Sequence, residues 1–220
     1  MLPFYGRKLS RKIGKLNYKD LVNFSFFFDE SNYSKVLKTF QKVKEPINLE
    51  IGFGAGENLI FQSNKKKKEF FLACDPFLAG SFKLKKHIEK EDLKNIYFTN
   101  FDFLTFAKLM KGLSFKNIYI LFPDPWHKKK HNKRRLINFE FPEILEKISN
   151  ENVEIFIATD DIDYSNQIIQ SFMVYEKFKL RHYQLEQKDI ELSDKFFYQT
   201  KYFFKAMKVD SPINFFVVRK

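Results

Sequence analysis

The sequence contains a single cysteine, Cys74, so it has no disulfide framework and suits a reducing compartment. It also lacks any uncharged apolar run approaching about 18 residues, and no cationic segment followed by an apolar stretch opens the chain. We therefore expect a cytoplasmic protein with no membrane partner. Acidic residues are scarce too, with 27 Asp and Glu against 39 Lys and Arg.

This imbalance gives a formal net charge of +12 and a pI near 9.5, which favours a phosphate-rich partner over an acidic protein. Lys, Phe, Asn, Ile and Tyr are all frequent, as in genomes biased toward adenine and thymine. Mutational bias is therefore an alternative origin of the charge. The run Lys65 to Lys68 fits a solvated loop.

The length of 220 residues and the even composition predict a single domain over residues 23–220, preceded by a basic arm over residues 1–22. The arm includes RKLSRKIGK, from Arg7 to Lys15, which has too few large apolar side chains to pack. It either becomes ordered on a partner or is a disordered tail. The aromatic stretch Asn23 to Phe40 is expected to pack at the domain's edge.

From Ile47 onward, five short apolar strands alternate with helical segments, which predicts an α/β fold with a parallel sheet and right-handed crossovers. The strands are INLEIGFG, EFFLACD, NIYFTNFD, NIYILFP and VEIFIATD. One helix is expected to begin at Glu57. Four others are expected over Phe77–Lys90, Phe103–Met110, Leu136–Ser149 and Tyr164–Tyr175. Two further strands, KFKLRHYQL and INFFVVR, flank a polar loop from Glu186 to Phe204 and are expected to pair antiparallel at the sheet's edge.

The first of these strands leads into a glycine turn, EIGFGAG, which contains Glu50, Gly52, Gly54 and Gly56. Glycines allow positive φ angles and a close approach of the backbone to a ligand. The GK[ST] of a P-loop is absent, and so is GxGxxG, because the third glycine comes one residue early. The turn alone is a weak signal of a nucleotide-like ligand.

Acids follow the next two strands. Asp75 can accept both hydroxyls of a ribose, and the segment Asn100 to Asp102 can accept from the amino group of adenine. Each acid is also readable as an ordinary helix N-cap. The combination of a glycine turn with acids on successive strand ends resembles the class I S-adenosyl-L-methionine-dependent methyltransferases, whose seven-stranded sheet has an antiparallel last strand.

The stretch from Asn117 to Arg135, NIYILFPDPWHKKKHNKRR, sets a strand, one acid, two prolines and the only tryptophan directly before a basic loop. Ligands bind at the carboxyl ends of strands in open α/β sheets, so Asp124 is a candidate reaction centre. Trp126 either lines the pocket, stacks on a base, or packs in the core.

The block FPDPWHKKKHNKRR resembles the signature of the bacterial tRNA (guanine-N7-)-methyltransferases, and YGRKLSRKIGKL, LEIGFGAG, ATDDIDY and TKYF extend the resemblance over most of the chain. The resemblance implies a Rossmann-like class I methyltransferase fold: a mostly parallel seven-stranded sheet, an antiparallel last strand and helices on both faces. It also implies methyl transfer from S-adenosyl-L-methionine to N7 of a guanosine in the variable loop of tRNA.

By this resemblance, Asp124 is at the reaction centre, and four acids and the glycines of the turn bind the cofactor. The cofactor residues are Glu50, Gly52, Gly54, Gly56, Asp75, Asp102 and Asp124. The implied substrate contacts are Lys128, Asp160, Thr200, Lys201 and Tyr202. The implied RNA contacts are Lys130, His131, Asn132, Lys133, Arg134 and Arg135.

Two positions depart from the family pattern. Asp75 stands where the family usually has the longer Glu, and Phe203 stands where an acid would follow TKF. The second departure bears on nucleoside recognition rather than on the reaction. The protein is expected to act as a monomer or homodimer without an obligate partner subunit.

No metal is predicted. His127 and His131 have the spacing of metal ligands, but three lysines lie between them and the Glu of HExxH is absent. Asp160, Asp161 and Asp163 are acidic enough for Mg²⁺, although such a turn is more often a helix cap.

Two other functions fit part of the sequence. DPW after the fourth strand is similar to the [DN]PP[YW] motif of exocyclic-amine methyltransferases, although its prolines are arranged differently. A non-catalytic RNA-binding domain of the same fold is the alternative outside enzymes, and the strand-end acids argue against it.

Overall fold

The computed structural model describes residues 18–185, 197–208 and 212–220. Most of the basic arm predicted for residues 1–22 lies outside these ranges. Its last five residues form helix α1 (Tyr18–Val22), in which Leu21 is fully buried. The described chain forms two compact units, divided between Phe115 and Lys116. Whether residues 23–220 act as one domain stays a prediction.

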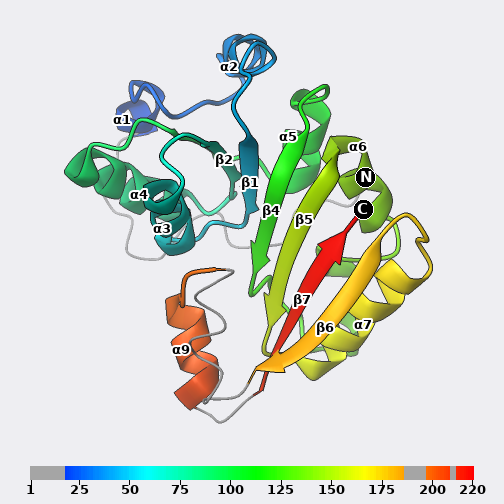
Figure 1. Cartoon of the computed structure of the whole chain (residues 1–220). Coiled ribbons are helices and arrows are strands. Elements are labelled where there is room, and N and C mark those ends of the chain that lie inside the picture. Colours follow the sequence, from blue (N-terminus) through cyan, green and yellow to red (C-terminus); the bar gives the residue numbers. More distant parts are fainter. Residues whose placement is uncertain (1–17, 186–196, 209–211) are drawn as a thin grey trace. The chain divides into compact units, whose positions relative to one another are not determined.

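Within the described residues, seven strands make up the sheet, in the order β3-β2-β1-β4-β5-β7-β6 (Figure 1). This confirms the predicted seven-stranded sheet with an antiparallel last strand, and the structure adds that β7 lies between β5 and β6. The strands are β1 (Ile47–Ile51), β2 (Phe70–Cys74), β3 (Ile96–Thr99), β4 (Phe115–Leu121), β5 (Ser149–Thr159), β6 (Lys179–Leu185) and β7 (Ile213–Arg219).

The first unit contains β1, β2 and β3, which pair in parallel. All five residues of β1 are buried, as expected for a strand covered on both faces. The helices of this unit after α1 are α2 (Tyr33–Phe40), α3 (Glu57–Lys65), α4 (Leu78–Glu91) and α5 (Phe103–Leu109). The aromatic stretch before β1 lies along β3, because Phe28 N donates to Phe98 O and Phe98 N donates to Phe26 O.

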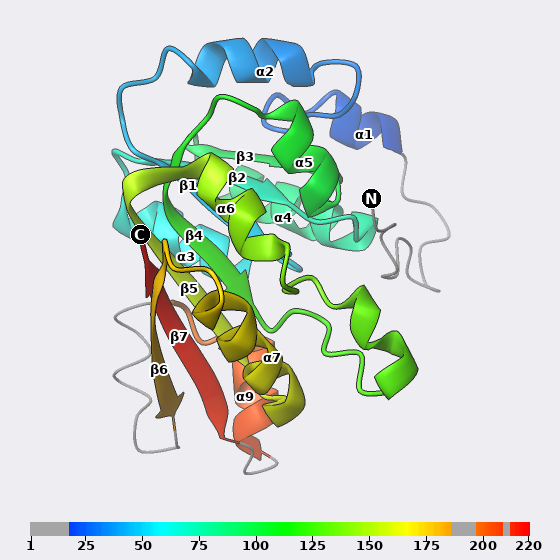
Figure 2. The ribbon, with the colours of Figure 1, turned by 90° about the vertical axis from the view of Figure 1, so that its right-hand side faces the viewer.

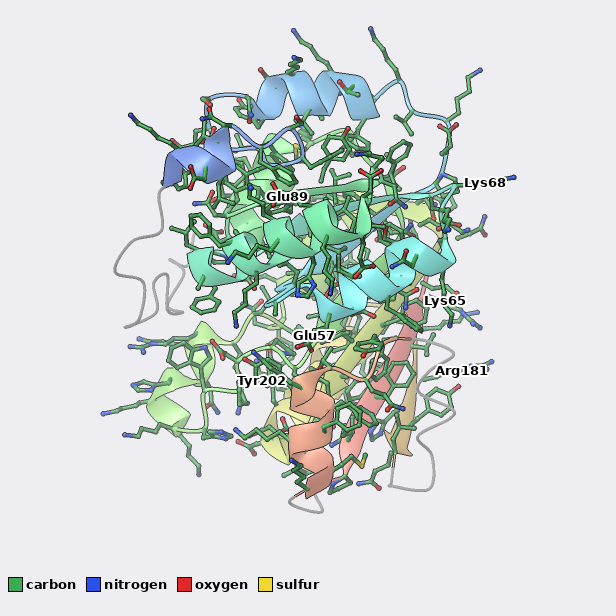
Figure 3. The ribbon with its side chains drawn as sticks, turned by 90° about the vertical axis from the view of Figure 1, so that its left-hand side faces the viewer. Glu57, Lys65, Lys68, Glu89, Arg181 and Tyr202 are labelled. Atoms are coloured by element: carbon green, nitrogen blue, oxygen red, sulfur yellow. The ribbon has the colours of Figure 1, made fainter. Side chains whose placement is uncertain are left out.

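The second unit contains the remaining strands. β7 pairs antiparallel with both β5 and β6, as predicted for the last two strands. Its helical elements are the 3₁₀ helix η1 (Lys129–Arg134) and the helices α6 (Phe141–Ile148), α7 (Ile162–Met173) and α9 (Lys201–Lys208). Helices α7 and α9 lie on opposite sides of these strands (Figure 2, Figure 3).

Two predicted elements differ from the structure. The helix expected from Leu136 begins only at Phe141, where Pro142 occupies the first turn and needs no N–H partner. The polar loop expected to reach Phe204 ends earlier, because residues 201–204 form the first turn of α9 and Phe203 is buried.

The sequence predicts a solvated loop for the lysine run Lys65 to Lys68. Lys65 ends α3 and Lys68 lies in the turn after it, and both are exposed (Figure 3). Cys74 is buried in β2, as a core residue would be. Among the helices that the structure describes, none combines the length and the apolar character needed to cross a membrane.

Candidate active site

The glycine turn between β1 and α3 adopts the left-handed backbone that its sequence indicated. Gly52, Gly54 and Gly56 have φ angles of 79°, 56° and 85°. Apart from Gly52 and its two chain neighbours, no described residue has an atom within 4 Å of the point where a Cβ on Gly52 would be. The turn therefore leaves open space directly beside its backbone, where a ligand could approach closely.

Gly80 supports this turn, although its role was not predicted from the sequence. A Cβ on Gly80 would lie 1.9 Å from the carbonyl oxygen of Gly54, so α4 packs directly against the glycine turn. The available signal was a glycine inside a predicted helix, which is unfavourable and usually reflects a close packing contact.

The parallel register brings the three strand ends of the first unit to one level. Ile51 is paired with Cys74, and Cys74 with Thr99, so Gly52, Asp75 and Asn100 follow at the same height. Backbone hydrogen bonds continue past the strands, from Gly52 N to Cys74 O (2.8 Å) and from Asp75 N to Thr99 O (3.1 Å). The glycine turn and the two following loops thus lie along the same edge.

Asp75 holds the glycine turn in place. Its Oδ2 accepts from Gly54 N at 2.7 Å, and its Oδ1 accepts from Phe77 N at 2.8 Å. The residue is 8% exposed. The shorter acid at this position therefore links the first strand-end loop to the start of α4.

Glu50 is buried within β1, where its Oε2 accepts from Asn58 Nδ2 at 2.9 Å. Burial raises the pKa of this carboxyl from 4.5 to about 8. The hydrogen bond from Asn58 lowers the pKa, while the charges of Asp75 and Glu57 raise it further. Glu50 thus holds a proton under conditions in which an exposed glutamate would have lost it.

Asp102 serves as the N-cap of α5, the alternative role considered for each strand-end acid. Its Oδ1 accepts from Thr105 N at 3.0 Å, and its Oδ2 accepts from Thr105 Oγ1 at 2.8 Å. Capping uses one lone pair on each carboxylate oxygen, so capacity for a ligand remains.

In the second unit, the FPDPW segment leaves β4 through two unusual backbone conformations. Phe122 and Trp126 have positive φ angles of 53° and 50°, which are uncommon for residues other than glycine. Phe122 N donates to Ala158 O at 2.8 Å, which fixes the segment beside the end of β5. Asp124 retains solvent contact, but the surrounding protein atoms displace enough water to raise the pKa of its carboxyl.

The basic loop that follows projects to one side of the strands of this unit (Figure 2). Lys128, Lys130 and Lys133 are exposed. With its amide nitrogen facing the two carbonyls, Asn132 donates to Trp126 O (3.1 Å) and Lys128 O (3.2 Å), so it shapes the loop from within.

Trp126 is half-buried and packs within this loop. Its ring meets the His131 ring edge-on at 5.9 Å, and the Arg134 guanidinium lies 5.0 Å from its centroid. Desolvation lowers the pKa of His131, and the charges of Arg134 and the neighbouring lysines lower it further. His131 is therefore biased toward its neutral form.

The acids after β5 are used in two ways. Asp161 caps α7 by accepting from Tyr164 N at 2.7 Å, and its Oδ2 lies 2.7 Å from His127 Nδ1. Asp160 is exposed. Among the described residues, no group of three or more His, Cys, Asp or Glu could hold a metal ion.

Arg135 differs from the other residues expected along the RNA. Its side chain is 1% exposed, and its Nε donates to Pro125 O at 2.7 Å. A guanidinium enclosed in this way presents no surface to a polyanion. The prediction of an RNA contact therefore does not fit Arg135 as the structure places it.

The segment Thr200 to Tyr202 lies beside the FPDPW segment, since the Tyr202 ring stacks on Phe122 with centroids 6.4 Å apart. Tyr202 lies on the first turn of α9 (Figure 3). Phe203, which replaces the family's acid, is fully buried and packs against Phe197 at 6.1 Å. Its side chain is part of the core.

Comparison with known proteins decides the family. Residues 44–215 match a family described as "Putative methyltransferase". A tRNA (guanine-N(7)-)-methyltransferase of Wolbachia pipientis is 34% identical over 192 residues, covering 85% of this chain and 80% of that protein. A protein of the same name from Neorickettsia sennetsu is 34% identical over 172 residues, covering 77% and 74%. The chain belongs to the tRNA (guanine-N(7)-)-methyltransferase family.

Solved methyltransferases share the fold at low identity. An antibiotic-related methyltransferase covers 88% of this chain and 94% of its own, with a TM-score of 0.57 and 17% identity. A methyltransferase structure from Streptococcus mutans in complex with SAH covers 88% and 100%, with a TM-score of 0.51 and 10% identity. These similarities confirm the predicted fold class.

The raised pKa of Glu50 makes stability depend on pH. The folded protein keeps a proton on Glu50 up to about pH 8, whereas the unfolded chain loses it near pH 4.5. Unfolding therefore releases a proton in this window, and the free energy of unfolding falls as pH rises from about 5 to 8. Glu50→Gln should flatten this fall in urea unfolding at pH 5, 6.5 and 8. Equal pH slopes in the two proteins would contradict the assignment.

Gly80→Ala should destabilise the protein, although alanine ordinarily stabilises a helix interior by about 1 kcal/mol relative to glycine. The added methyl group would lie 1.9 Å from Gly54 O, so α4 and the glycine turn must separate. We expect a loss of about 1 to 3 kcal/mol in urea unfolding, with weaker binding of the methyl donor in calorimetry. Lys86→Ala, at an exposed position of α4, is the control. A stabilised Gly80→Ala protein with unchanged donor binding would refute the packing argument.

Proposed function

We propose that this protein transfers a methyl group from S-adenosyl-L-methionine to N7 of a guanosine in tRNA. The observation that carries the proposal is the 34% identity between this chain and a relative named for that activity, which covers 85% of this chain and 80% of the relative. The glycine turn and the acids at successive strand ends support a nucleoside-containing methyl donor. The finer proposal is that the target lies in the variable loop of the tRNA.

The residues of the first unit fit this cofactor. The open space beside Gly52 admits a ligand against the backbone. The carboxylate of Asp75 accepts from the backbone of both adjacent loops, at Gly54 N and Phe77 N, so it lies where a ribose hydroxyl could also donate to it. Glu50, Gly54, Gly56 and Asp102 are the other residues of the first unit in the proposed cofactor set, which also includes Asp124. When bound, the cofactor supplies the electrophilic methyl group of its sulfonium.

The reaction does not need a strong general base, because guanine N7 already carries an available lone pair on the major-groove edge. The work of the protein is to hold nitrogen, methyl and sulfur in line, which can contribute about 7 to 11 kcal/mol in favourable systems. Asp124 would accept from the N1 and N2 hydrogens of the guanine or balance the charge of the methylated ring. Asp124 lies between two prolines, and the residues two positions before and after it, Phe122 and Trp126, have positive φ angles.

The second unit supplies the proposed RNA-binding surface. The exposed side chains of Lys128, Asp160, Lys201 and Tyr202 are proposed to contact the target nucleoside, together with Thr200, which is buried at the start of α9. The loop residues Lys130, His131, Asn132, Lys133 and Arg134 are proposed to lie along the phosphate backbone. The protein would act in the cytoplasm as a monomer or homodimer without an obligate partner subunit.

The proposal is tested by incubating unmodified tRNA with the protein and S-adenosyl-L-methionine, followed by nucleoside analysis. We expect 7-methylguanosine. A methylated exocyclic amine would instead support the second enzyme class, and the absence of any methylated nucleoside would support a non-catalytic RNA-binding domain. Mapping the modified nucleotide in the same tRNA tests the variable-loop position.

Asp124→Asn keeps the size of the side chain but removes its charge. We expect kcat to fall by about 100-fold or more, as when a charge-stabilising group is removed from a reaction centre. Because desolvation raises the pKa of Asp124 above its ordinary value, wild-type activity should fall as pH decreases through this raised pKa. Steady-state kinetics across pH measure both effects. Near-normal turnover by Asp124→Asn would remove this role.

Replacing Lys130 and Lys133 together with glutamine should weaken tRNA binding and flatten its salt dependence. Each phosphate contact contributes about 0.9 to the slope of log affinity against log salt in duplex DNA, so a loss of roughly 1 to 2 is expected. Lys83→Gln with Lys86→Gln removes equal charge from exposed positions of α4 and serves as the control. Equal effects in the two double variants would show a general charge effect and no local contact.

A further inference from the structure

Arg135 closes the basic loop with a buried guanidinium that reaches back to the reaction segment. Its Nε donates to Pro125 O at 2.7 Å, and Pro125 directly follows Asp124. Its Nη1 donates to Gln167 Oε1 at 2.9 Å, and the guanidinium lies 4.9 Å from the centroid of the Tyr164 ring. One planar group thus joins the reaction segment to helix α7.

The charge of Arg135 is balanced from the same helix. Its Nη2 lies 3.8 Å from Asp161 Oδ1 and 3.7 Å from Asp163 Oδ2. Burying a cation is unfavourable unless it is paired and hydrogen-bonded. Nε and Nη1 of Arg135 are hydrogen-bonded, whereas the buried Nη2 makes no hydrogen bond and is compensated only by the two carboxylates within 4 Å. The bonds point in different directions from one rigid fork, which lysine cannot reproduce with a single nitrogen.

The chain just beyond Arg135 is held by the same two residues of α7. Ile137 N donates to Tyr164 Oη at 2.9 Å, and Gln167 Nε2 donates to Ile137 O at 2.8 Å. At the other end of the loop, His127 pairs with Asp161 at 2.7 Å. The segment from Pro125 to Ile137 is therefore anchored to the first turns of α7 at several points.

We propose that Arg135 is a positioning residue, whose guanidinium sets the place of Asp124 and Trp126 by holding the carbonyl of Pro125 against α7. The inference deepens the proposed function and rests on it. Phe122 and Trp126 keep a backbone conformation that is unfavourable for their residue types, so the segment needs external contacts to hold it. Arg135 supplies such a contact at Pro125, between them.

Arg135→Lys tests the proposal because it keeps the charge but loses the fork. A misplacement of the reacting groups by about 1 Å can cost about 100-fold in rate. We expect kcat to fall about 10- to 100-fold, with KM for tRNA and S-adenosyl-L-methionine changed less than about twofold. A phosphate contact would tolerate lysine, so an RNA-binding role predicts near-wild-type kcat.

Trp126 provides a readout that does not depend on activity, because it is the only tryptophan in the chain. Release of Pro125 should expose its half-buried ring, so Arg135→Lys should show a red-shifted emission and stronger quenching by acrylamide. Thermal unfolding of each variant checks that the fold is retained. If the wild type makes no 7-methylguanosine, the proposed function fails, and fluorescence still tests the contact to Pro125.

Gln167→Leu removes the acceptor on α7 to which Arg135 Nη1 donates, and it leaves the net charge unchanged. It should lower kcat in the same manner, and the double variant should lose less than the product of the two single effects, because both remove the hydrogen bond between Arg135 and Gln167. Arg181→Lys, at an exposed position of β6 (Figure 3), is the matched control and should match the wild type. Wild-type kcat and fluorescence in Arg135→Lys, or independent losses in the double variant, would overturn the proposal.

Discussion

The parallel register of the first three strands is the constraint on which the cofactor half of the protein depends. Parallel strands present their carboxyl ends at one edge, and the backbone groups beyond those ends must find partners outside the ladder. Here Asp75 accepts from the amide of Gly54, and Gly80 allows α4 to approach the carbonyl of the same residue. These contacts hold the turn at Gly54, and the backbone beside Gly52, two residues earlier, is open.

Each unit contains a buried ionisable side chain that makes defined hydrogen bonds to its neighbours. Glu50 lies in a completely buried strand with Asn58 as its hydrogen-bond partner, and its raised pKa reflects the unfavourable burial of a carboxylate. Arg135 lies in a comparable position in the second unit, but it stays compensated because carbonyl, amide and carboxylate oxygens surround it. Such groups contribute little to stability compared with apolar side chains of similar size, but they favour one arrangement of their neighbours.

The departures from the family's pattern have different physical meanings. Asp75 is shorter than the usual glutamate and hydrogen-bonds to the backbone of the adjacent loops. Phe203 replaces an acid at a position that faces the core beside Phe197, so its apolar character follows from burial. The first departure lies at the proposed ribose contact, whereas the second belongs to the packing of α9.

The sequence alone determined the strands, the glycine turn and the order of the strand-end acids, because apolar periodicity, glycine and proline act over a few neighbouring residues. It also carried the long motif that indicates the family. Only the tertiary structure decided that Arg135 points inward, that Gly80 touches Gly54, and that residues 201–204 are helical. These outcomes depend on contacts between residues far apart in the chain: basic residues in a run look alike in sequence, and one becomes buried only where a distant helix supplies its partners.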